Sequence, residues 1–503
     1  MNMRAVNSIL IVGGGTAGWM AAASLKHHFK QRIDITLVES SEIGTIGVGE
    51  ATIPTIRQFY HQLGLSDLDV IRATRATCKL GIQFNDWHKP GSSFIHPFGV
   101  YGQSLKGTDF HHYWLKLKQK NQVASLGDYS LGAVLAKNNK FTFPAINPPS
   151  SLSVFDWALH FDAALFAVLM RKHAEANGVR RIDAKITRVN QRVSDGFIES
   201  VQLDYGATLA ADLFIDCSGF KGLLIEETLG TGYENWSDWL LCDRAFAVQS
   251  HSVGAPNSYT KVTARPAGWQ WQIPLQHRDG NGHVFSSQFM RDEIAREMLI
   301  NNVPGELLHE PRKIGFRPGR RKQTWNKNCI AIGLAAGFLE PLESTSIALI
   351  QTGIEKIRML LAAGQYNDSI VREFNETTQL EYERVRDFII LHYKLNARDD
   401  TEFWRHCRAM DIPDSLQHKM ALFKASGHVV NYRWEMFGLP SWLAIFEGFD
   451  CLPEVYDAQV DQLDEAMLVQ NLERMRESLR AIVADTPDHG DFIAQHCAVP
   501  EYT

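Results

Sequence analysis

The sequence lacks a basic excess, a Cys-x-x-Cys pair and a long apolar run. Its 503 residues include 51 lysines and arginines against 57 aspartates and glutamates, a net charge of −6, so no positive surplus is present to bind a phosphate backbone. Its seven cysteines are an odd number, which favours neither a disulfide framework nor a zinc cluster. We therefore expect a reduced, cytoplasmic protein with no nucleic acid partner and no metal site.

The apolar residues are not arranged for a membrane either. No stretch reaches the roughly 18 to 20 consecutive apolar residues that a membrane span needs. An apolar run follows Arg4, but Gly13, Gly14, Gly15 and Gly18 interrupt it, which a secretory signal helix would not favour. With 45% apolar and 21% charged residues, the composition is that of a globular chain with two or three folding units.

A short apolar strand over residues 9–12 leads directly into a glycine cluster and a helix-forming run, and a second strand over 33–38 follows. In this arrangement the first glycine permits a tight turn, the second lets the backbone approach a pyrophosphate, and the third lets the helix pack on the strand. The start of the helix offers N–H groups to phosphates, and an acid after the second strand can bind a ribose. The residues expected at a dinucleotide are Gly13, Gly15, Thr16, Ala17, Gly18 and Glu39.

The cofactor strands do not follow one another without interruption. Strand-like segments return around 185–190, at 213–216 before a glycine, and again from 329. A nicotinamide domain would continue through consecutive strand and helix units, whereas an interrupted return is typical of flavoproteins. The sequence therefore favours FAD.

The other segments predict an α/β organisation with a discontinuous cofactor module. A helix is expected from about Trp157 to Ala176, an alternating strand from Gly268 to Pro274, and a mainly helical chain from Glu355 onward. We expect an FAD-binding module of residues 1–55, 150–225 and 325–355, an inserted substrate and sheet region of residues 56–149 and 226–324, and a helical substrate-binding part of residues 356–503.

Five separated segments, in the family's order, resemble the flavin-dependent halogenases, a family that includes the tryptophan halogenases. They are Gly13-Gly14-Gly15-Thr16-Ala17-Gly18-Trp19, Gly47-Val48-Gly49-Glu50-Ala51-Thr52, Cys78-Lys79-Leu80-Gly81, Trp269-x-Trp271-x-Ile273-Pro274 and Glu340-Pro341-Leu342-Glu343-Ser344-Thr345. The tryptophan signature is the most specific. The resemblance implies an FAD-binding Rossmann-like fold of the GR2-type flavoprotein monooxygenase kind. It assigns to the cofactor Val48, Gly49, Glu50, Val189, Leu334 and Ile347 as well.

The resemblance implies a two-component enzyme. Reduced FAD, supplied as a co-substrate by a separate flavin reductase, reacts with O₂, and chloride or bromide is oxidised to hypohalous acid. That oxidant passes through an internal tunnel and halogenates a small, electron-rich aromatic molecule. The family also suggests a homodimer.

Lys79 and Glu343 match the two catalytic residues of the family. An amine can hydrogen-bond hypohalous acid or capture its halogen, and a carboxylate can polarise the oxidant and take the ring proton. Without the resemblance, Lys79 would more often be a surface lysine and Glu343 a helix-capping acid. The halide is expected at the backbone N–H groups of Thr345 and Ser346, at a helix start. Ser346 stands where the tryptophan enzymes carry glycine, which leaves chloride or bromide open.

The expected substrate site is aromatic. Trp269 and Trp271 alternate on a strand and face the same side; in the family such rings separate substrate from flavin, and a packed core is the alternative. His96 and Phe98 resemble a pair that sandwiches indole, the alternative being a loop anchored by aromatic residues. Residues 431–446 do not reproduce the paired tyrosines and glutamate that hold the amino acid. We therefore expect indole or an indole-like or phenol-like molecule rather than free tryptophan.

Two other functions remain open at this point. A flavin-dependent aromatic hydroxylase shares the fold, but it usually carries a Gly-Asp pair where this chain has Gly333-Leu334. A non-catalytic binding protein, resembling the Rab GDP-dissociation inhibitors, would have no reason to keep Lys79 and Glu343. Halogenated product, hydroxylated product or mere oxidation of flavin by air would separate the three.

Overall fold

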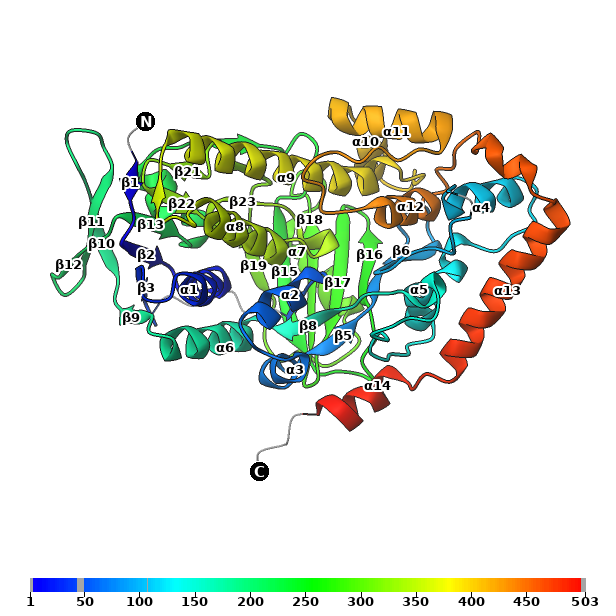
Figure 1. The fold of residues 1–503 in the computed structure, drawn as a ribbon, viewed down its shortest axis with the longest axis horizontal. Helices are drawn as coiled ribbons and strands as arrows, with labels where there is room; N and C mark the ends of the chain where they lie inside the picture. Colours follow the sequence, from blue (N-terminus) through cyan, green and yellow to red (C-terminus); the bar gives the residue numbers. More distant parts are fainter. Residues whose placement is uncertain (1–2, 43–48, 106, 499–503) are drawn as a thin grey trace. The chain divides into compact units, whose positions relative to one another are not determined.

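The computed structural model, drawn as a ribbon in Figure 1, describes residues 3–42, 49–105 and 107–498. The chain divides into two compact units. The first unit comprises Met1–Arg75, Phe161–Asp243 and Gly315–Glu383, and the second Ala76–His160, Arg244–Ile314 and Arg384–Thr503. Each unit is thus assembled from three separated stretches. Among the described residues, no helix combines the length and apolar character that crossing a membrane requires.

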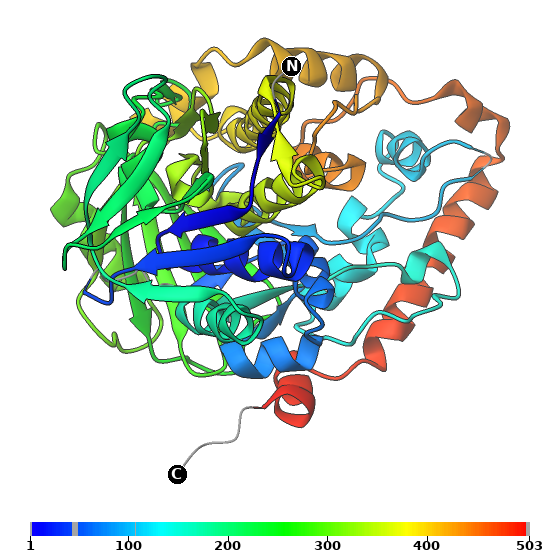
Figure 2. The same ribbon diagram turned by 60° about the vertical axis from the view of Figure 1, so that its left-hand side comes forward.

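The first unit is built on a six-stranded sheet with the order β21-β22-β13-β2-β3-β9. Its strands are β2 (Ser8–Val12), β3 (Asp34–Glu39), β9 (Arg180–Asp183), β13 (Leu213–Asp216), β21 (Trp325–Asn326) and β22 (Cys329–Ala331). All neighbours pair in parallel except β21 with β22. Strand β13 is buried throughout, as expected for a parallel strand covered on both faces. The dark blue strands β2 and β3 lie side by side in Figures 1 and 2.

Helices accompany this sheet. The helix α1 (Thr16–Phe29) connects β2 to β3 and packs against α6 (Ala163–Ala176) and α8 (Ser346–Leu360). The unit also contains α2 (Thr55–Gln62), α3 (Asp67–Thr74), β1 (Arg4–Ala5), β4 (Gly49–Ala51), β14 (Tyr233–Asn235), β20 (Gly319–Arg321), β23 (Gly337–Phe338) and β24 (Gln365–Tyr366). This is the Rossmann-like α/β fold expected from the sequence.

The segment around 185–190 lies outside the parallel sheet, contrary to our prediction. There β10 (Ile186–Gln191), β11 (Ile198–Leu203) and β12 (Thr208–Ala210) form a separate antiparallel sheet. The residues of β10 are exposed or only half-buried, which suits an antiparallel sheet with one face in water and not a covered parallel strand. The chain returns to the parallel sheet earlier, through β9.

The helix predicted from Trp157 to Ala176 also begins later. Ala158–Asp162 is a fully buried strand, β8, and α6 starts at Ala163. The carboxylate of Asp162 accepts hydrogen bonds from the N–H groups of Ala164 and Leu165 at 3.0 and 3.1 Å. An N-cap aspartate of this kind fixes the helix start. The apolar residues before it form a strand instead.

The second unit is built on a sheet with the order β19-β15-β18-β17-β16-β6-β7. The bounds are β6 (Gly81–Asn85), β7 (Ser93–Pro97), β15 (Arg244–Ser250), β16 (Thr260–Arg265), β17 (Gly268–Pro274), β18 (Asp279–Phe285) and β19 (Arg312–Gly315). Strand β17 confirms the alternating strand expected at these residues. A short strand that carries Lys79, β5 (Thr77–Lys79), pairs antiparallel with β8.

The chain from Glu355 onward is mainly helical, as predicted, and it supplies most helices of the second unit. The helices of this unit are α4 (Phe110–Lys118), α5 (Leu131–Lys137), α7 (Asp292–Asn302), α10 (Glu402–Ala409), α11 (Asp414–Ser426), α12 (Leu439–Gly448), α13 (Glu465–Ala484) and α14 (His489–Phe492), together with the end of α9 (Asp368–Lys394). The red helix α13 packs against α5 (Figure 1).

Candidate functional site

The turn between β2 and α1 needs glycine at two positions, and the steric reason differs between them. Gly13 has a φ of +109°, and a Cβ there would lie 2.3 Å from the carbonyl oxygen of Cys217. A Cβ on Gly18 would lie 1.9 Å from the carbonyl oxygen of Gly13, so the helix packs closely on the turn. A Cβ on Gly15 would meet no heavy atom of the described residues within 4 Å. The face of the turn at Gly15 is therefore the one that a phosphate group can approach.

The start of α1 adds donors to this turn. Gly15 is the N-cap residue and supplies no side-chain cap in the described structure, and the first turn holds no acidic residue. The backbone N–H groups of Thr16 and Ala17 therefore keep the donor capacity that a helix start offers to an anion. The turn and the helix start together fit the diphosphate of FAD.

Glu39 ends β3 beside the same turn. A Cβ on Gly14 would lie 1.5 Å from its carboxylate oxygen, so Gly14 is also required, which the spacing of the motif did not reveal. The carboxylate accepts hydrogen bonds from Trp19 Nε1 at 3.3 Å and from Arg181 Nε at 2.5 Å. Sequence reasoning missed Arg181, because β9 is distant in the chain and carries no motif. The acid is held in place, and its contact with a ribose stays a prediction.

The other predicted cofactor residues are Val48, Gly49, Glu50, Val189, Leu334 and Ile347. Val48 lies outside the described residues, as does Gly47 of the same segment. Glu50 lies on β4, where burial raises the pKa of its carboxyl from 4.5 to about 7. Val189 lies on the separate antiparallel sheet. Leu334 follows β22 in a 3₁₀ turn, and Ile347 is buried at the start of α8. Contact of any of them with FAD stays a prediction.

Glu343 lies in the first unit, at the entry to α8. Its side chain is 1% exposed, and it ends a 3₁₀ turn that starts at Pro341. The next residue, Ser344, has a φ of 59° and a ψ of 35°. A non-glycine residue in this left-handed region is uncommon and is found preferentially at functional sites. The turn leads directly to Thr345, the N-cap of α8, and Ser346, its first residue.

The buried hydroxyl of Thr345 makes no hydrogen bond to the described residues. Thr345 is 0% exposed. Native proteins seldom leave a buried polar atom unsatisfied, and a water or an ion is a common explanation. With the N–H groups at the start of α8, this hydroxyl makes a donor set suited to an anion.

Lys79 lies in the second unit and is wholly buried. Its side chain is 0% exposed, and its Nζ lies 5.2 Å from the centroid of the Phe98 ring, within the range of a cation–π contact. Lysine is almost never fully buried without a compensating interaction. The surface position that a lone lysine usually takes is therefore not the position of Lys79.

Trp269 and Trp271 lie on one face of β17, as their alternation predicts. Their ring centroids are 5.9 Å apart, and Trp269 also lies 6.4 Å from Trp87. Gly282 on β18 stands directly opposite Trp271, and a Cβ there would lie 2.0 Å from the Trp271 ring. The ring therefore occupies the space that the missing side chain leaves. Its role in separating substrate from flavin stays a prediction.

His96 and Phe98 belong to a larger group of rings. The His96 ring, at the end of β7, lies 6.5 Å from Phe98, 5.9 Å from Phe388 and 6.3 Å from Phe437. Phe388 stacks on Phe437 at 4.1 Å and meets Trp442 edge-on at 5.0 Å. We call these five residues the aromatic cluster. Sequence reasoning missed Phe388, and it did not place Trp442 of the segment 431–446 beside His96, because only the fold brings α9 and α12 to β7.

Two buried charges lie beside the aromatic cluster. The side chains of Lys419 and Glu435 are 1% and 5% exposed and form an ion pair. The Lys419 ammonium also lies 3.9 Å from the centroid of the Trp442 ring. The carboxylate of Glu435 is therefore already engaged by a cation of the protein.

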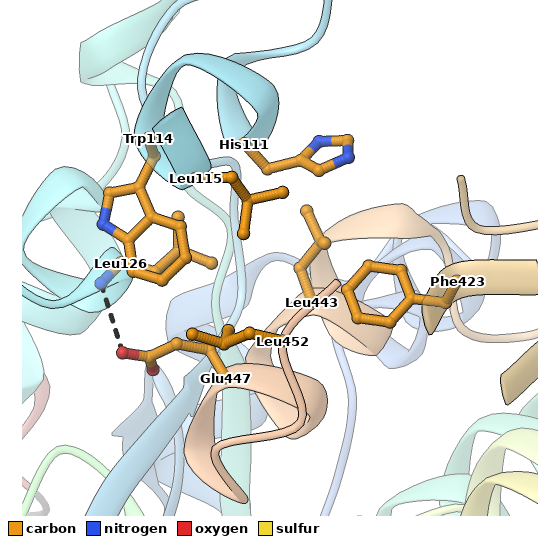
Figure 3. Close-up of a pocket in the computed structure, with 8 residues that line it drawn as sticks. All are labelled: His111, Trp114, Leu115, Leu126, Phe423, Leu443, Glu447 and Leu452. Carbon is orange, nitrogen blue, oxygen red and sulfur yellow. Dashed lines mark hydrogen bonds between the residues drawn. The ribbon is translucent and has the colours of Figure 1, made fainter. Parts of the chain in front are cut away.

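A small cavity lies elsewhere in the second unit, between α4, α12 and the turn at Leu126 (Figure 3). Its volume of about 10 Å³ holds about one water molecule, too little for an aromatic substrate. The carboxylate of Glu447 at its edge accepts the N–H of Leu126 at 3.4 Å, and burial raises the pKa of this carboxyl. We assign no substrate to this cavity.

Comparisons with known proteins agree across nearly the whole chain. The tryptophan halogenase family matches residues 8–465. The tryptophan 6-halogenase SttH of Streptomyces toxytricini is 34% identical, covering 98% of this chain and 99% of the relative. The tryptophan 7-halogenase RebH of Lentzea aerocolonigenes is also 34% identical, over 85% and 83% of the two chains.

Solved structures give the same result. BrvH, a flavin-dependent halogenase from Brevundimonas sp. BAL3, superposes with a TM-score of 0.95 at 57% identity, covering 98% of this chain and 99% of its own. Xcc4156, a flavin-dependent halogenase from Xanthomonas campestris, gives a TM-score of 0.95 at 42% identity over 99% of both chains. Neither the hydroxylase nor the binding-protein alternative is favoured. The chain belongs to the tryptophan halogenase family and is a flavin-dependent halogenase.

Proposed function

We propose that this enzyme uses reduced FAD from a separate flavin reductase, O₂ and chloride or bromide to halogenate indole or an indole derivative rather than free tryptophan. The single observation that carries the chemistry is the full burial of the Lys79 ammonium against Phe98. An amine that is shielded from water can hold a reactive halogen without losing it to hydrolysis.

The glycine turn and the start of α1 would hold the diphosphate of FAD, with Glu39 at its ribose. When bound, reduced FAD supplies the electrons for reaction with O₂ and thereby the oxidising power needed to activate halide. The backbone N–H groups of Thr345 and Ser346, with the Thr345 hydroxyl, would bind the halide as an anion.

Lys79 and Glu343 take complementary parts in the transfer. The Lys79 ammonium donates a hydrogen bond to the oxygen of hypohalous acid, which makes the halogen more electrophilic, or its neutral amine takes the halogen as a haloamine with release of water. The ring carbon of the substrate attacks this halogen, whose bond to the oxygen or to the Lys79 nitrogen breaks so that water or the amine leaves, and the carboxylate of Glu343 accepts the proton that the ring then loses.

The aromatic cluster supports indole as the substrate class. Rings that surround a planar substrate supply a large apolar contact. Recognition of a free amino acid would also need an available carboxylate for the ammonium group, and Glu435 already pairs with Lys419. Several curated relatives are tryptophan halogenases by name. We infer that this enzyme differs from them in the residues that would bind the amino-acid group of tryptophan.

The test is a comparison of kcat/KM for indole and tryptophan. The purified protein is supplied with FAD, an NADH-driven flavin reductase, O₂ and either bromide or chloride, and the product is identified by its halogen isotope pattern in mass spectrometry. We expect monohalogenated indole and a higher kcat/KM for indole. A much higher kcat/KM for tryptophan would contradict the substrate assignment.

The proposal also includes the cellular compartment of the enzyme and its protein partners. An odd number of cysteines without a Cys-x-x-Cys pair suits the reducing cytoplasm. The reductase partner and a homodimer are what the family suggests. Size-exclusion chromatography with light scattering measures the oligomeric state directly.

A further inference from the structure

Two histidines of the second unit lie wholly buried beside the strand that carries Lys79. His160 and His489 are both 0% exposed, and neither lies in the segments that carry the family resemblance. His160 is on β8, directly opposite Thr77 of β5. His489 is the first residue of α14, near the end of the chain.

The ring of His489 connects β5 to a loop. The backbone N–H of Cys78 donates a hydrogen bond to His489 Nε2 at 3.1 Å, and His489 Nδ1 lies 2.9 Å from the carbonyl oxygen of Pro256. A carbonyl oxygen can only accept, so the proton is on Nδ1, while Nε2 offers its lone pair to the amide. The geometry therefore requires a neutral ring, and burial lowers the pKa of His489 to about 4.

The ring of His160 is fixed in the same way. The Thr77 hydroxyl donates its only proton to the carbonyl oxygen of Pro274 at 2.7 Å. It therefore accepts from His160 Nδ1 at 3.1 Å, and the Thr260 hydroxyl lies 2.9 Å from His160 Nε2, where it can donate to the lone pair of a neutral ring. The lowered pKa of His160 selects this neutral form. Burial first, and then the neighbouring Lys79 and His489, hold the pKa of His160 well below its ordinary value.

These bonds hold both edges of the lysine strand. On one edge β5 pairs with β8, where Lys79 stands opposite Ala158. Toward the other side, the N–H of Cys78 is held by His489, and the N–H of Leu80 donates to the carbonyl oxygen of Ser258 at 2.7 Å. Amides two residues apart on a strand point the same way. The backbone on each side of Lys79 is therefore anchored, and the Lys79 side chain starts from a fixed point.

We propose that His489 and His160 are positioning residues for Lys79, because their neutral rings fix strand β5 and hold the ammonium where it meets the oxidant. This rests on the catalytic role proposed above for Lys79. A neutral ring serves two needs here. It accepts a hydrogen bond that a cationic ring cannot accept, and it adds no second positive charge beside the buried lysine.

The test compares two neutral polar substitutions of His489. Glutamine places a carbonyl oxygen near the position of Nε2 and can still accept the N–H of Cys78, whereas asparagine reaches only the position of Nδ1. The full-length protein, with FAD, reductase, bromide and indole, is assayed for kcat, for the KM of indole, and for the share of oxidised flavin that yields bromoindole. Circular dichroism measures the folded fraction.

We expect His489→Gln to keep kcat within about threefold of the wild type, and His489→Asn to lose on the order of 10²-fold, because small displacements of a catalytic group cost that much. The KM of indole and the rate of flavin oxidation stay unchanged, so flavin is oxidised without bromination. A general structural defect would lower all of these together. Equal kcat values for the two folded variants overturn the proposal.

A substitution at Thr77 tests the contact with His160. It can still refute the proposal if His489→Asn does not fold. Thr77→Val removes the hydroxyl that joins His160 to Pro274 and keeps the shape of the side chain. We expect the same pattern of lower kcat at unchanged KM. A wild-type kcat in this variant overturns the proposal for His160, and with an unfolded asparagine variant it overturns the proposal as a whole.

Lys79→Met is assayed in parallel to separate this inference from the proposed function. Absence of product from the wild type, or full activity of Lys79→Met, overturns the proposed function and the positioning role with it. An inactive Lys79→Met together with equally active glutamine and asparagine variants overturns the positioning role of His489 alone.

Discussion

The Nζ atom of Lys79 lies 5.2 Å from the centroid of the Phe98 ring, and the Lys79 side chain is fully buried. Phe98 is at the same time a member of the aromatic cluster through its contact with His96. The buried amine and the rings that would hold a planar substrate are thus neighbours within one unit of the protein. This proximity makes the catalytic proposals directly testable.

Replacing Lys79 by methionine removes the amine and keeps the length of the side chain. We expect kcat for halogenation to fall on the order of 10³-fold, because positioned proton donors and nucleophiles contribute factors of this size. Oxidation of reduced flavin continues. Lys261→Met is the matched control, because Lys261 is exposed on β16. Halogenation by Lys79→Met at the rate of the control would remove Lys79 from the mechanism.

Glu343→Gln keeps the shape of a buried side chain and removes its ability to take a proton. We expect a loss of about 10²-fold to 10⁴-fold in kcat, with little change in the KM of the aromatic substrate. The exposed Glu376 on α9, changed to glutamine, controls for the loss of one negative charge. Steady-state rates of indole halogenation measure the effect, and unimpaired turnover by Glu343→Gln would exclude a role as the base.

Thr345→Val should separate stability from halide binding. The Thr345 hydroxyl is buried without a partner among the described residues, so its removal should leave the free energy of unfolding unchanged or raise it by up to about 1 kcal/mol. If the hydroxyl binds halide, the KM of bromide rises about tenfold, equivalent to about 1.4 kcal/mol. Urea titration and bromide-dependent rates measure the two quantities. A lower stability with unchanged bromide KM would refute the assignment.

Gly282→Ala should disturb Trp271 from across the sheet. The added Cβ would lie 2.0 Å from the Trp271 ring, so we expect a destabilisation of about 1–3 kcal/mol, as in other overpacked cores. Gly315→Ala is the control, because a Cβ there meets no described heavy atom within 4 Å, and about 0.5 kcal/mol or less is expected. Thermal unfolding compares the two, and equal melting temperatures would contradict the packing described for Trp271.

Glu50 should make the protein less stable as the pH rises. Burial raises the pKa of its carboxyl from 4.5 to about 7, so between these values the folded state binds more protons than the unfolded state. The free energy of unfolding therefore falls across this window, by about 3 kcal/mol for a shift of this size. Glu50→Gln should flatten this dependence, and the exposed Glu199, changed to glutamine, should not. Urea unfolding of both variants at pH 5 and pH 8 gives four free energies of unfolding. Parallel pH dependences for the two variants would contradict the raised pKa of Glu50.

The sequence by itself determined the features that depend on local chemistry. The glycine turn after β2, the strand Gly268–Pro274 and the common face of Trp269 and Trp271 follow from spacing and backbone sterics, and the structure confirms them. The family was also evident from short motifs, because their order and spacing are specific. Periodicity alone failed at Ala158–Asp162, where a continuous apolar run concealed a buried strand before the N-cap of α6.

Only the tertiary structure decided which distant residues meet. Arg181 reaches Glu39 from β9, Phe388 and Trp442 join His96 from two helices, and His489 binds the strand of Lys79 from near the end of the chain. None of these contacts leaves a local pattern, because each depends on long-range packing of buried apolar surface. The burial of Lys79 belongs here too, since an isolated lysine in a sequence is normally read as a surface residue.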